Sequence, residues 1–259
     1  MLIPLPPLLP VSTHNNPLSA RNSPLLCYVT DRPALRIANP ADSLAALIQK
    51  IEEVVAAGID WVQIREKDLP ARELASLTRQ ALLIAAKYSA KRSSPVRVLV
   101  NDRLDVAIAE GADGVHLGEK SLPVMEAKRL VESAIRKQTI EQSFLIGASC
   151  HSIEVAQTAE RDGADYIFFG PVFSTPSKAM YGEPQGLTRL AELCRLVAIP
   201  VLAIGGIAEN ANSCLQAGAT GLAAIRLFQD ASDPLLAVRR LHQLSMDSRP
   251  QSLEDPPAS

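Results

Sequence analysis

The chain has 259 residues, of which 47% are hydrophobic and 21% are charged, so it is long enough to bury the core of one α/β domain. Its formal net charge of −2 gives no general attraction for nucleic acid or for an anionic membrane, and any recognition of phosphate must be local. The four cysteines have no C-x-x-C spacing, which favours reduced thiols in a cytosolic protein over a disulfide framework.

The two ends of the chain differ from its middle. Residues 1–24 are rich in proline, which interrupts helices, and lack the basic segment of a signal peptide, so we expect a disordered leader. Residues 244–259 are polar and proline-rich and are predicted to form a disordered tail. No run approaches the roughly 20 apolar residues that a membrane span requires. These patterns predict a soluble, cytoplasmic protein with one folded domain over residues 25–243.

Between the ends, apolar strands alternate with amphipathic helices. Strands are predicted at 25–30, 61–64, 96–100, 114–117, 144–147, 166–169, 201–204 and 221–225. Helices are predicted at 43–57, about 71–88, 104–110 and about 122–135, and Ser152 is expected to be the N-cap of the next helix. The phrases GIDWVQI, GADGVHL, GADYIFF and GATGLAA share a helix-ending glycine, a turn residue and a strand. About eight such units predict an α/β fold, a single-domain (β/α)8 TIM barrel, with a doubly wound open sheet as the alternative.

Polar residues follow several of these strands, where a TIM barrel builds its active site. The period of two in a strand puts Gln63, Arg65 and Lys67 on one side, where they would offer an amide and two cations to an anionic ligand. A solvated charge run is the alternative. Asn101 and Asp102 follow a very apolar strand. Asp102 could hold Mg²⁺ bridged to a diphosphate, or it could make an Asx turn or cap a helix.

The later loops also carry candidate ligand groups. Thr175, Ser177 and Lys178 lie on a glycine-rich loop that suits anion capture or a lid, with a plain flexible loop as the alternative. Gly205 and Gly206 follow the seventh strand and match, together with the end of the eighth, the phosphate site that TIM barrels form between their last two loops.

Two histidines within the strand–helix ladder have different expected roles. His151 follows the fifth strand and could be a general acid or base, or a structural hydrogen-bonding group. His116 lies within a strand and is expected in the core.

Together, the motifs QIREK, VNDRLDVAIAEGADGVHLG, GASCHS, FFGPVFSTPSK, AIGGI and GLAAIR make residues 25–243 resemble the thiamine phosphate synthase/TenI family. That family has a (β/α)8 barrel, in agreement with the strand count. The resemblance implies a transferase that joins hydroxymethylpyrimidine diphosphate to thiazole phosphate and releases pyrophosphate. The pyrimidine amino group would help to stabilise a benzylic-type cation as the diphosphate leaves, and the thiazole nitrogen would capture this cation. The protein would stabilise the leaving group and position the reactants.

The resemblance also implies a role for each matching position. Mg²⁺ would be the cofactor, with Asp102 as its ligand, and Arg65, Lys67, Lys178 and His151 would serve catalysis. The pyrimidine diphosphate would be held by Gln63, Ile64, Arg65, Glu66, Lys67, Asn101, Ser149 and Lys178. The thiazole phosphate would be held by Thr175, Pro176, Ser177, Gly205, Gly206, Ile225 and Arg226. The expected partners are these two small phosphorylated substrates, with neither nucleic acid nor membrane, and a homodimer is left open.

Three positions depart from the synthase pattern. Ser121 occupies the place of a second Mg²⁺ aspartate, Arg226 stands where synthases usually carry Ser, and Ser177 replaces Thr. Ser121 and Arg226 favour the alternative of a TenI-type thiazole tautomerase, which needs no metal and keeps an acid/base histidine at the position of His151. The retained Lys178, Asn101 and Asp102, together with the full QIREK motif, favour the synthase. A non-catalytic thiazole or thiamine phosphate-binding regulator is a second alternative, and a sugar-phosphate isomerase or aldolase is a third.

Overall fold

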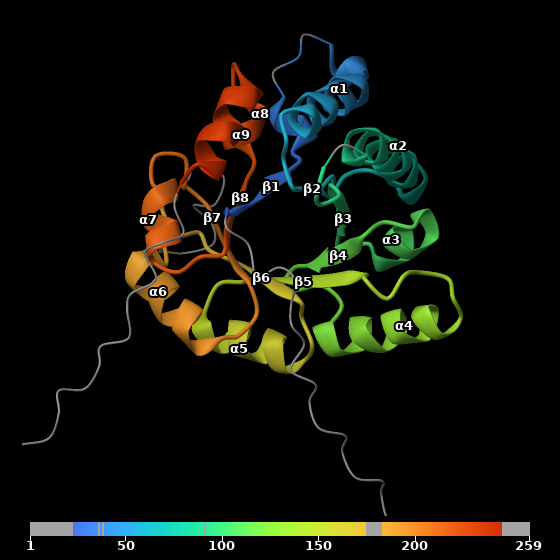
Figure 1. The fold of residues 1–259 in the computed structure, drawn as a ribbon. Helices are drawn as coiled ribbons and strands as arrows, with labels where there is room; N and C mark the ends of the chain where they lie inside the picture. The colour runs from blue at the N-terminus through green and yellow to red at the C-terminus, as the bar shows by residue number, and fades with distance from the viewer. Residues whose placement is uncertain (1–22, 36, 38, 91, 175–182, 245–259) are drawn as a thin grey trace, which may run out of the picture.

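Eight parallel strands close into a barrel in the computed structural model, which describes residues 23–35, 37, 39–90, 92–174 and 183–244. Each strand pairs with its neighbour in the chain, and β8 pairs with β1. The strands lie at the centre of the molecule with the helices around them (Figure 1). The predicted single-domain TIM barrel is therefore confirmed, and the open sheet is excluded. The strands are β1 Leu25–Val29, β2 Trp61–Ile64, β3 Arg97–Asn101, β4 Gly114–Leu117, β5 Leu145–Cys150, β6 Tyr166–Phe169, β7 Val201–Ile204 and β8 Gly221–Ala224.

Helices follow the strands and cover the outside of the barrel (Figure 1). Residues 1–22 and 245–259 lie outside the described residues, so the disordered leader and tail stay predictions. Within the described parts of the chain, no helix is long and apolar enough to cross a membrane. The helices are η1 Arg32–Ala34, η2 Pro40–Asp42, α1 Ser43–Ala56, α2 Ala71–Ser89, α3 Leu104–Glu110, α4 Val124–Arg136, α5 Ile153–Arg161, α6 Gly186–Leu196, α7 Ala211–Gln216, α8 Arg226–Gln229 and α9 Pro234–His242.

The alternation of side chains along the strands creates two apolar layers. One fills the barrel interior and includes Trp61 and Tyr166, whose ring centroids lie 4.8 Å apart at an interplanar angle of 65°. The larger layer lies between the strands and the helices and includes the intervening strand positions, such as Val62 and Ile167. Successive strand residues point to opposite faces, so a polar side chain near a strand end is directed either to the interior or to the helices by its position alone.

The repeated glycine–acid–strand phrases have a common structural basis. Asp60 accepts a hydrogen bond from the backbone N–H of Leu26 at 3.0 Å, and its own N–H donates to the carbonyl of Leu26 at 3.2 Å. Asp113 makes the same reciprocal pair with Val98, and Asp165 makes it with Ile146. Each aspartate therefore binds the first residues of its strand to the preceding strand, which sets the register of the pair. The carboxyl ends of the strands take no part in these aspartate contacts and remain available for a functional site.

Most predicted elements match the structure. Ser152 is the N-cap of α5 and its hydroxyl accepts the N–H of Val155 at 3.2 Å, as predicted. Gly111 ends α3 at φ +68°, a conformation that favours glycine. The predicted strand at 144–147 was too short, because β5 continues to Cys150. Ser149 and Cys150 keep the alternation of the strand: Cys150 packs in the outer layer, while Ser149 bonds to a side chain of the interior.

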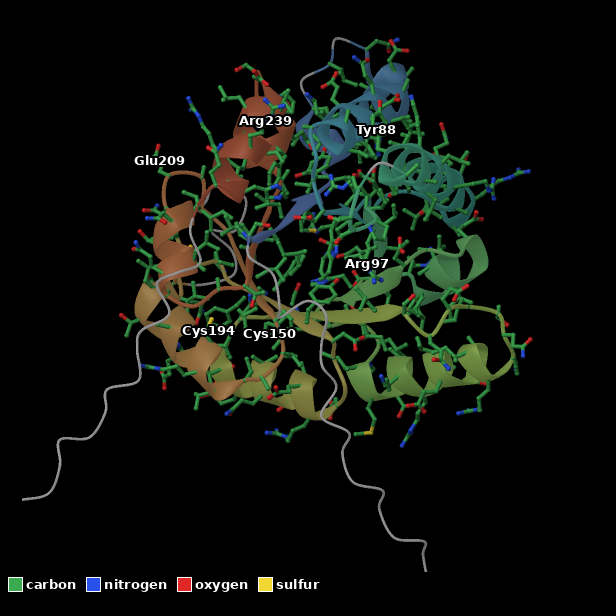
Figure 2. All side chains as sticks on the ribbon, in the orientation of Figure 1. Tyr88, Arg97, Cys150, Cys194, Glu209 and Arg239 are labelled. Atoms are coloured by element: carbon green, nitrogen blue, oxygen red, sulfur yellow. The ribbon has the colours of Figure 1, made fainter. Side chains whose placement is uncertain are left out.

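The four cysteines are free thiols, as the sequence predicted. Figure 2 shows Cys150 and Cys194 close to the layer between strands and helices. Burial raises the pKa of the Cys150 thiol and of the Cys194 and Cys214 thiols to about 12, so these groups stay protonated and unreactive at neutral pH.

Candidate active site

A row of hydrogen-bonded polar groups crosses the carboxyl ends of β2, β3 and β4. Gln63 Nε2 donates to Asn101 Oδ1 at 3.3 Å, and Asn101 Nδ2 donates to Asp102 Oδ2 at 2.7 Å. The backbone N–H of Gly118 donates to Asp102 Oδ1 at 3.0 Å. The structure therefore brings together three predicted site residues, Gln63, Asn101 and Asp102, at the barrel end where TIM-barrel enzymes keep their active site.

Asp102 is held in an unusual backbone conformation and carries a charge. Its φ of +61° lies in the left-handed region, which is uncommon for a residue other than glycine. Burial alone would raise its pKa, but hydrogen bonds from Ser121, Gly118 and Asn101 and the nearby Lys67 cation together hold the pKa of Asp102 below its usual value. Asp102 is therefore an ionised carboxylate at neutral pH.

The donor set around Asp102 limits how a metal could bind. Ser121 donates a hydrogen bond from its hydroxyl to Asp102 Oδ1, so the residue at the degenerate metal position contacts the remaining carboxylate directly. Within the described residues, no three His, Cys, Asp or Glu side chains form a group that could enclose a metal ion. A carboxylate has about four lone-pair positions, of which hydrogen bonds occupy three here. These groups fit Mg²⁺ held by one carboxylate and by substrate oxygens, a common arrangement for this ion.

The QIREK segment divides between the two sides of the barrel wall. Gln63 bonds across the strand ends as described, whereas the Ile64 side chain is fully buried in the outer layer. Glu66 is also buried, and its Oε1 accepts the Thr30 hydroxyl at 2.6 Å. Both Glu66 oxygens accept the backbone N–H of Arg32 at 3.1 Å. Burial raises the pKa of Glu66, and these hydrogen bonds offset part of that effect.

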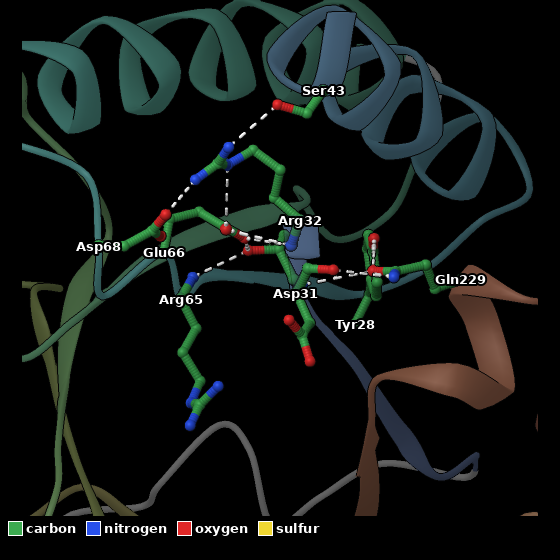
Figure 3. A network of polar contacts seen from close by, with 9 residues as sticks. Tyr28, Asp31, Arg32, Ser43, Arg65, Glu66, Asp68 and Gln229 are labelled. Carbon is green, nitrogen blue, oxygen red and sulfur yellow. Dashed lines mark hydrogen bonds and ion pairs between the residues drawn. The ribbon is translucent and has the colours of Figure 1, made fainter. Parts of the chain in front are cut away.

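This Glu66 network positions the cation beside it (Figure 3). Thr30 Oγ1 donates to Glu66 and accepts the backbone N–H of Arg65 at 2.9 Å, so the loops after β1 and β2 are tied together. The Arg32 guanidinium completes the network through Ser43 at 3.0 Å and through Asp68. The structure thus directs the Glu66 carboxylate to the β1 loop, where it supports the placement of Arg65.

Asp31 is a candidate site residue that the sequence analysis missed. Gln229 is buried and holds the backbone of Asp31 from both sides: its Nε2 donates to the Asp31 carbonyl at 3.0 Å, and its Oε1 accepts the Asp31 N–H at 3.3 Å. Tyr28 fixes Gln229 through a 2.8 Å hydrogen bond. Figure 3 shows the Asp31 carboxylate and the Arg65 guanidinium pointing the same way, away from α1. The position of Asp31 just after β1 was the feature of the sequence that could have identified it as a candidate.

Ser149 is connected to the barrel interior. Its Oγ lies 2.8 Å from Nε2 of His116, whose Nδ1 lies 3.1 Å from the Tyr166 hydroxyl. His116 was expected in the core, and it is 1% exposed. The core position predicted for His116 is therefore confirmed, whereas its hydrogen bond to Ser149 was not predicted.

His151 lies next to the end of β6. Its Nδ1 donates to the carbonyl of Gly170, because a carbonyl oxygen can only accept, and its backbone N–H donates to Glu119 Oε1 at 2.9 Å. Glu119 thus links the loop after β4 to the loop after β5.

The two glycines after β7 are required by close packing. A Cβ on Gly205 would lie 2.7 Å from Cα of Pro171, and a Cβ on Gly206 would lie 2.8 Å from the carbonyl oxygen of Ser174. Both have positive φ, at +92° and +66°. The loops after β6 and β7 can therefore approach one another, and phosphate binding by the glycine amides stays a prediction.

The other predicted phosphate residues are less constrained. Ile225 precedes α8 and Arg226 begins it, with the Arg226 side chain exposed. Thr175, Pro176, Ser177 and Lys178 lie outside the described residues. A cavity of about 530 Å³ also reaches Asp102, but it runs over α3 and α4 past Leu104, Leu122 and Leu130 rather than over the strand ends.

The fold and the polar groups at its strand ends define a TIM-barrel enzyme with an amide, carboxylate and cation site. The family model described as thiamine monophosphate synthase (TMP-TENI) matches residues 34–228. The chain therefore belongs to the thiamine monophosphate synthase family.

Individual relatives agree with this family. A putative thiamine-phosphate synthase of Geobacter sulfurreducens is 44% identical over 196 residues, covering 75% of this chain and 85% of the relative. A thiamine-phosphate synthase of Methanoculleus marisnigri is 43% identical over 187 residues, covering 72% and 82%. Among solved structures, a thiamine phosphate pyrophosphorylase from Pyrococcus furiosus has a TM-score of 0.70 and 32% identity, covering 86% of this chain and 96% of that one.

Proposed function

We propose that this protein is a thiamine-phosphate synthase. It transfers the pyrimidinylmethyl group of hydroxymethylpyrimidine diphosphate to the nitrogen of thiazole phosphate and releases pyrophosphate. The observation that carries the proposal is the row from Gln63 through Asn101 to Asp102 across three strand ends, in a chain whose family match covers residues 34–228. This row joins two amides and an ionised carboxylate at the barrel mouth, with the Lys67 cation near enough to lower the pKa of that carboxylate.

The reaction exchanges one bond to the pyrimidine methylene carbon for another. The C–O bond to the diphosphate breaks and its electron pair leaves with the diphosphate, and the lone pair of the thiazole nitrogen forms the new C–N bond. The protein must stabilise charge on the departing diphosphate and hold the two rings in line. Arg65 and Lys67 serve the first task, Arg65 with a fork of donors and Lys67 as a point charge. Glu66 and Thr30 support Arg65 from behind.

Asp102 is the residue that would hold Mg²⁺. Its lowered pKa keeps it ionised. The hydrogen bonds that the described residues make to Asp102 leave it one lone-pair position, which suits a shared ion more than a fully enclosed one. When bound, Mg²⁺ supplies charge neutralisation to the leaving diphosphate. Ser121 holds the Asp102 carboxylate in place through its hydroxyl.

The remaining assignments are part of the same proposal. Lys178 completes the diphosphate site, the Gly206 amide and Arg226 hold the thiazole phosphate, and His151 stands beside the reacting groups. The free thiols support the cytoplasm as the compartment. Homodimerisation is proposed only on the family resemblance.

The test is a product assay with the purified full chain, both substrates and Mg²⁺. Asp102→Asn should lower the rate of thiamine phosphate formation by about 100-fold or more, as expected for loss of a charge at the leaving group. Glu132→Ala, an exposed change on α4, is the matched control and should leave the rate unaltered. Full activity of Asp102→Asn, or activity that is unaffected by a chelator, would contradict the proposed site. Aromatisation of the thiazole tautomer without any condensation would instead identify the tautomerase.

A further inference from the structure

A buried histidine and a buried tyrosine lie directly behind Ser149, inside the barrel. His116 on β4 and Tyr166 on β6 are 1% and 0% exposed. Their side chains form a series of hydrogen bonds that ends at Ser149, with 3.1 Å between the Tyr166 hydroxyl and His116 Nδ1, and 2.8 Å between His116 Nε2 and Ser149 Oγ. Three polar residues from three strands thus form one hydrogen-bonded unit under the site.

The barrel interior is shaped to place this unit. A Cβ on Gly147 would lie 2.0 Å from Cζ and 2.4 Å from the hydroxyl of Tyr166, so the tyrosine ring occupies space that only glycine leaves open. The His116 ring also packs against Phe168, with 4.2 Å between the ring centroids. The imidazole is therefore held between an aromatic ring and two hydroxyl groups.

The direction of the hydrogen bonds follows from the tyrosine. Burial raises the pKa of Tyr166 well above its usual value, so the phenol keeps its proton. A buried hydroxyl proton needs an acceptor, and within the described residues His116 Nδ1 is the acceptor in reach of this one. A neutral imidazole that accepts at Nδ1 carries its own proton on Nε2. His116 then donates to Ser149 Oγ, and the Ser149 hydroxyl proton is left to point away from the interior.

We propose that Tyr166 and His116 are positioning residues that fix the tautomer of the imidazole, so that Ser149 faces the barrel mouth as a hydrogen-bond donor for a diphosphate oxygen of the substrate. This inference rests on the proposed function for the identity of the anion. The arrangement of protons on Tyr166, His116 and Ser149 does not depend on the proposed function. An orientation fixed before the substrate arrives avoids the cost of turning the hydroxyl during the reaction.

The first test measures the tautomer. The protein has four histidines, and ¹⁵N-labelled histidine allows the ring nitrogens of His116 to be assigned by comparison with His116→Gln. The native spectrum should show a protonated Nε2 and an unprotonated Nδ1. In Tyr166→Phe, which keeps the ring and removes the hydroxyl, the Nδ1–H form should become populated. A native His116 in the Nδ1–H form would overturn the proposal, whether or not the protein is a synthase.

The second test measures the function of the unit by a double-mutant cycle in the synthase assay. Ser149→Ala and Tyr166→Phe should each lower kcat/KM for the pyrimidine diphosphate, Ser149→Ala by about 30-fold and Tyr166→Phe by about 10-fold, in the range of a hydrogen bond to a charged group. If Tyr166 acts through Ser149, the double variant should be no slower than Ser149→Ala. KM for the thiazole phosphate should stay within about twofold, because the unit serves the other substrate.

A structural control separates this role from a loss of stability. Thr78 is fully buried on α2 and its hydroxyl donates to the Leu74 carbonyl at 2.8 Å. Thr78→Val should therefore destabilise the protein through a lost buried hydrogen bond while leaving kcat/KM intact. If the enzyme is active and the fold-losses of Ser149→Ala and Tyr166→Phe multiply in the double variant, the two residues act independently. That result would overturn the proposed role of Tyr166 and His116 and leave the synthase function standing. A native chain that is inactive with both substrates would overturn the synthase function and, with it, the diphosphate role of Ser149.

Discussion

Replacement of Glu66 by alanine should destabilise the protein substantially, because this carboxylate is the centre of a buried network. Its side chain is 0% exposed and accepts hydrogen bonds from the Thr30 hydroxyl and the Arg32 backbone. Each hydrogen bond to a charged acceptor contributes about 1.5 kcal/mol, so loss of both costs about 3 kcal/mol. The Arg32 guanidinium lies 3.8 Å from Glu66 and is 18% exposed. In the variant it keeps its hydrogen bonds to Ser43 and Asp68, so loss of the Arg32–Glu66 ion pair adds little to the destabilisation.

The prediction is tested by thermal and urea unfolding. A loss of about 3 kcal/mol corresponds to a fall in Tm of about 6–12 °C for a chain of this size. Glu66→Gln keeps an acceptor and removes the burial penalty that raises the pKa of Glu66, so it should cost only about 1 kcal/mol. Glu132→Ala on the exposed face of α4 is the control, with no expected change. A Tm for Glu66→Ala within about 3 °C of the native value would show that the hydrogen bonds to Glu66 do not stabilise the fold to this extent.

Three further outcomes are expected. The pKa of Asp102 is lowered in the folded state, so its contribution to stability is full above its unfolded pKa of about 4 and is lost as pH falls through the lower folded value. In urea unfolding from pH 6 to pH 3, the difference in stability between the native protein and Asp102→Asn should shrink on the acid side, and a constant difference would contradict this. Ser121→Asp should tighten Mn²⁺ binding, measured by electron paramagnetic resonance, by about tenfold because it adds a second carboxylate, and an unchanged Kd would argue against a metal beside Asp102. Gly147→Ala should cost about 3 kcal/mol in urea unfolding because its Cβ would overlap the Tyr166 ring, and native-like stability would show that the ring can move freely.

The fold could be predicted from the sequence because its signals are local. Apolar runs such as Trp61–Ile64 and helix-ending glycines such as Gly111 give strand and helix boundaries within a few residues. The strand β5 was predicted too short because Ser149 and Cys150 are small or polar and follow a glycine-containing run, although they continue the pleat. Local polarity therefore hid a strand end that matters for the site.

The site could be predicted only in part, because its contacts join residues far apart in the chain. The positions of Gln63, Asn101 and Asp102 followed from strand ends alone, and the structure joins them by hydrogen bonds. The link from Ser149 to His116 spans 33 residues. No pattern within one segment marks such a partner; it depends on which side chains the closed barrel turns inward and on their size.

Likewise, Glu66 was expected at the substrate as part of the QIREK motif. Its partner Thr30 lies 36 residues earlier, on the neighbouring strand end. The alternation of side chains from β2 into the residues that follow it already separates Glu66 from Gln63 and Arg65. The identity of the group that receives Glu66 required the structure.

The synthase function is tested by the stoichiometry of the products that the native chain forms from hydroxymethylpyrimidine diphosphate and thiazole phosphate in the presence of Mg²⁺. Thiamine phosphate and pyrophosphate should form in equal amounts, and both should fall together when Mg²⁺ is removed. Pyrophosphate release without thiamine phosphate, or the absence of both products from a folded protein, would contradict the synthase function.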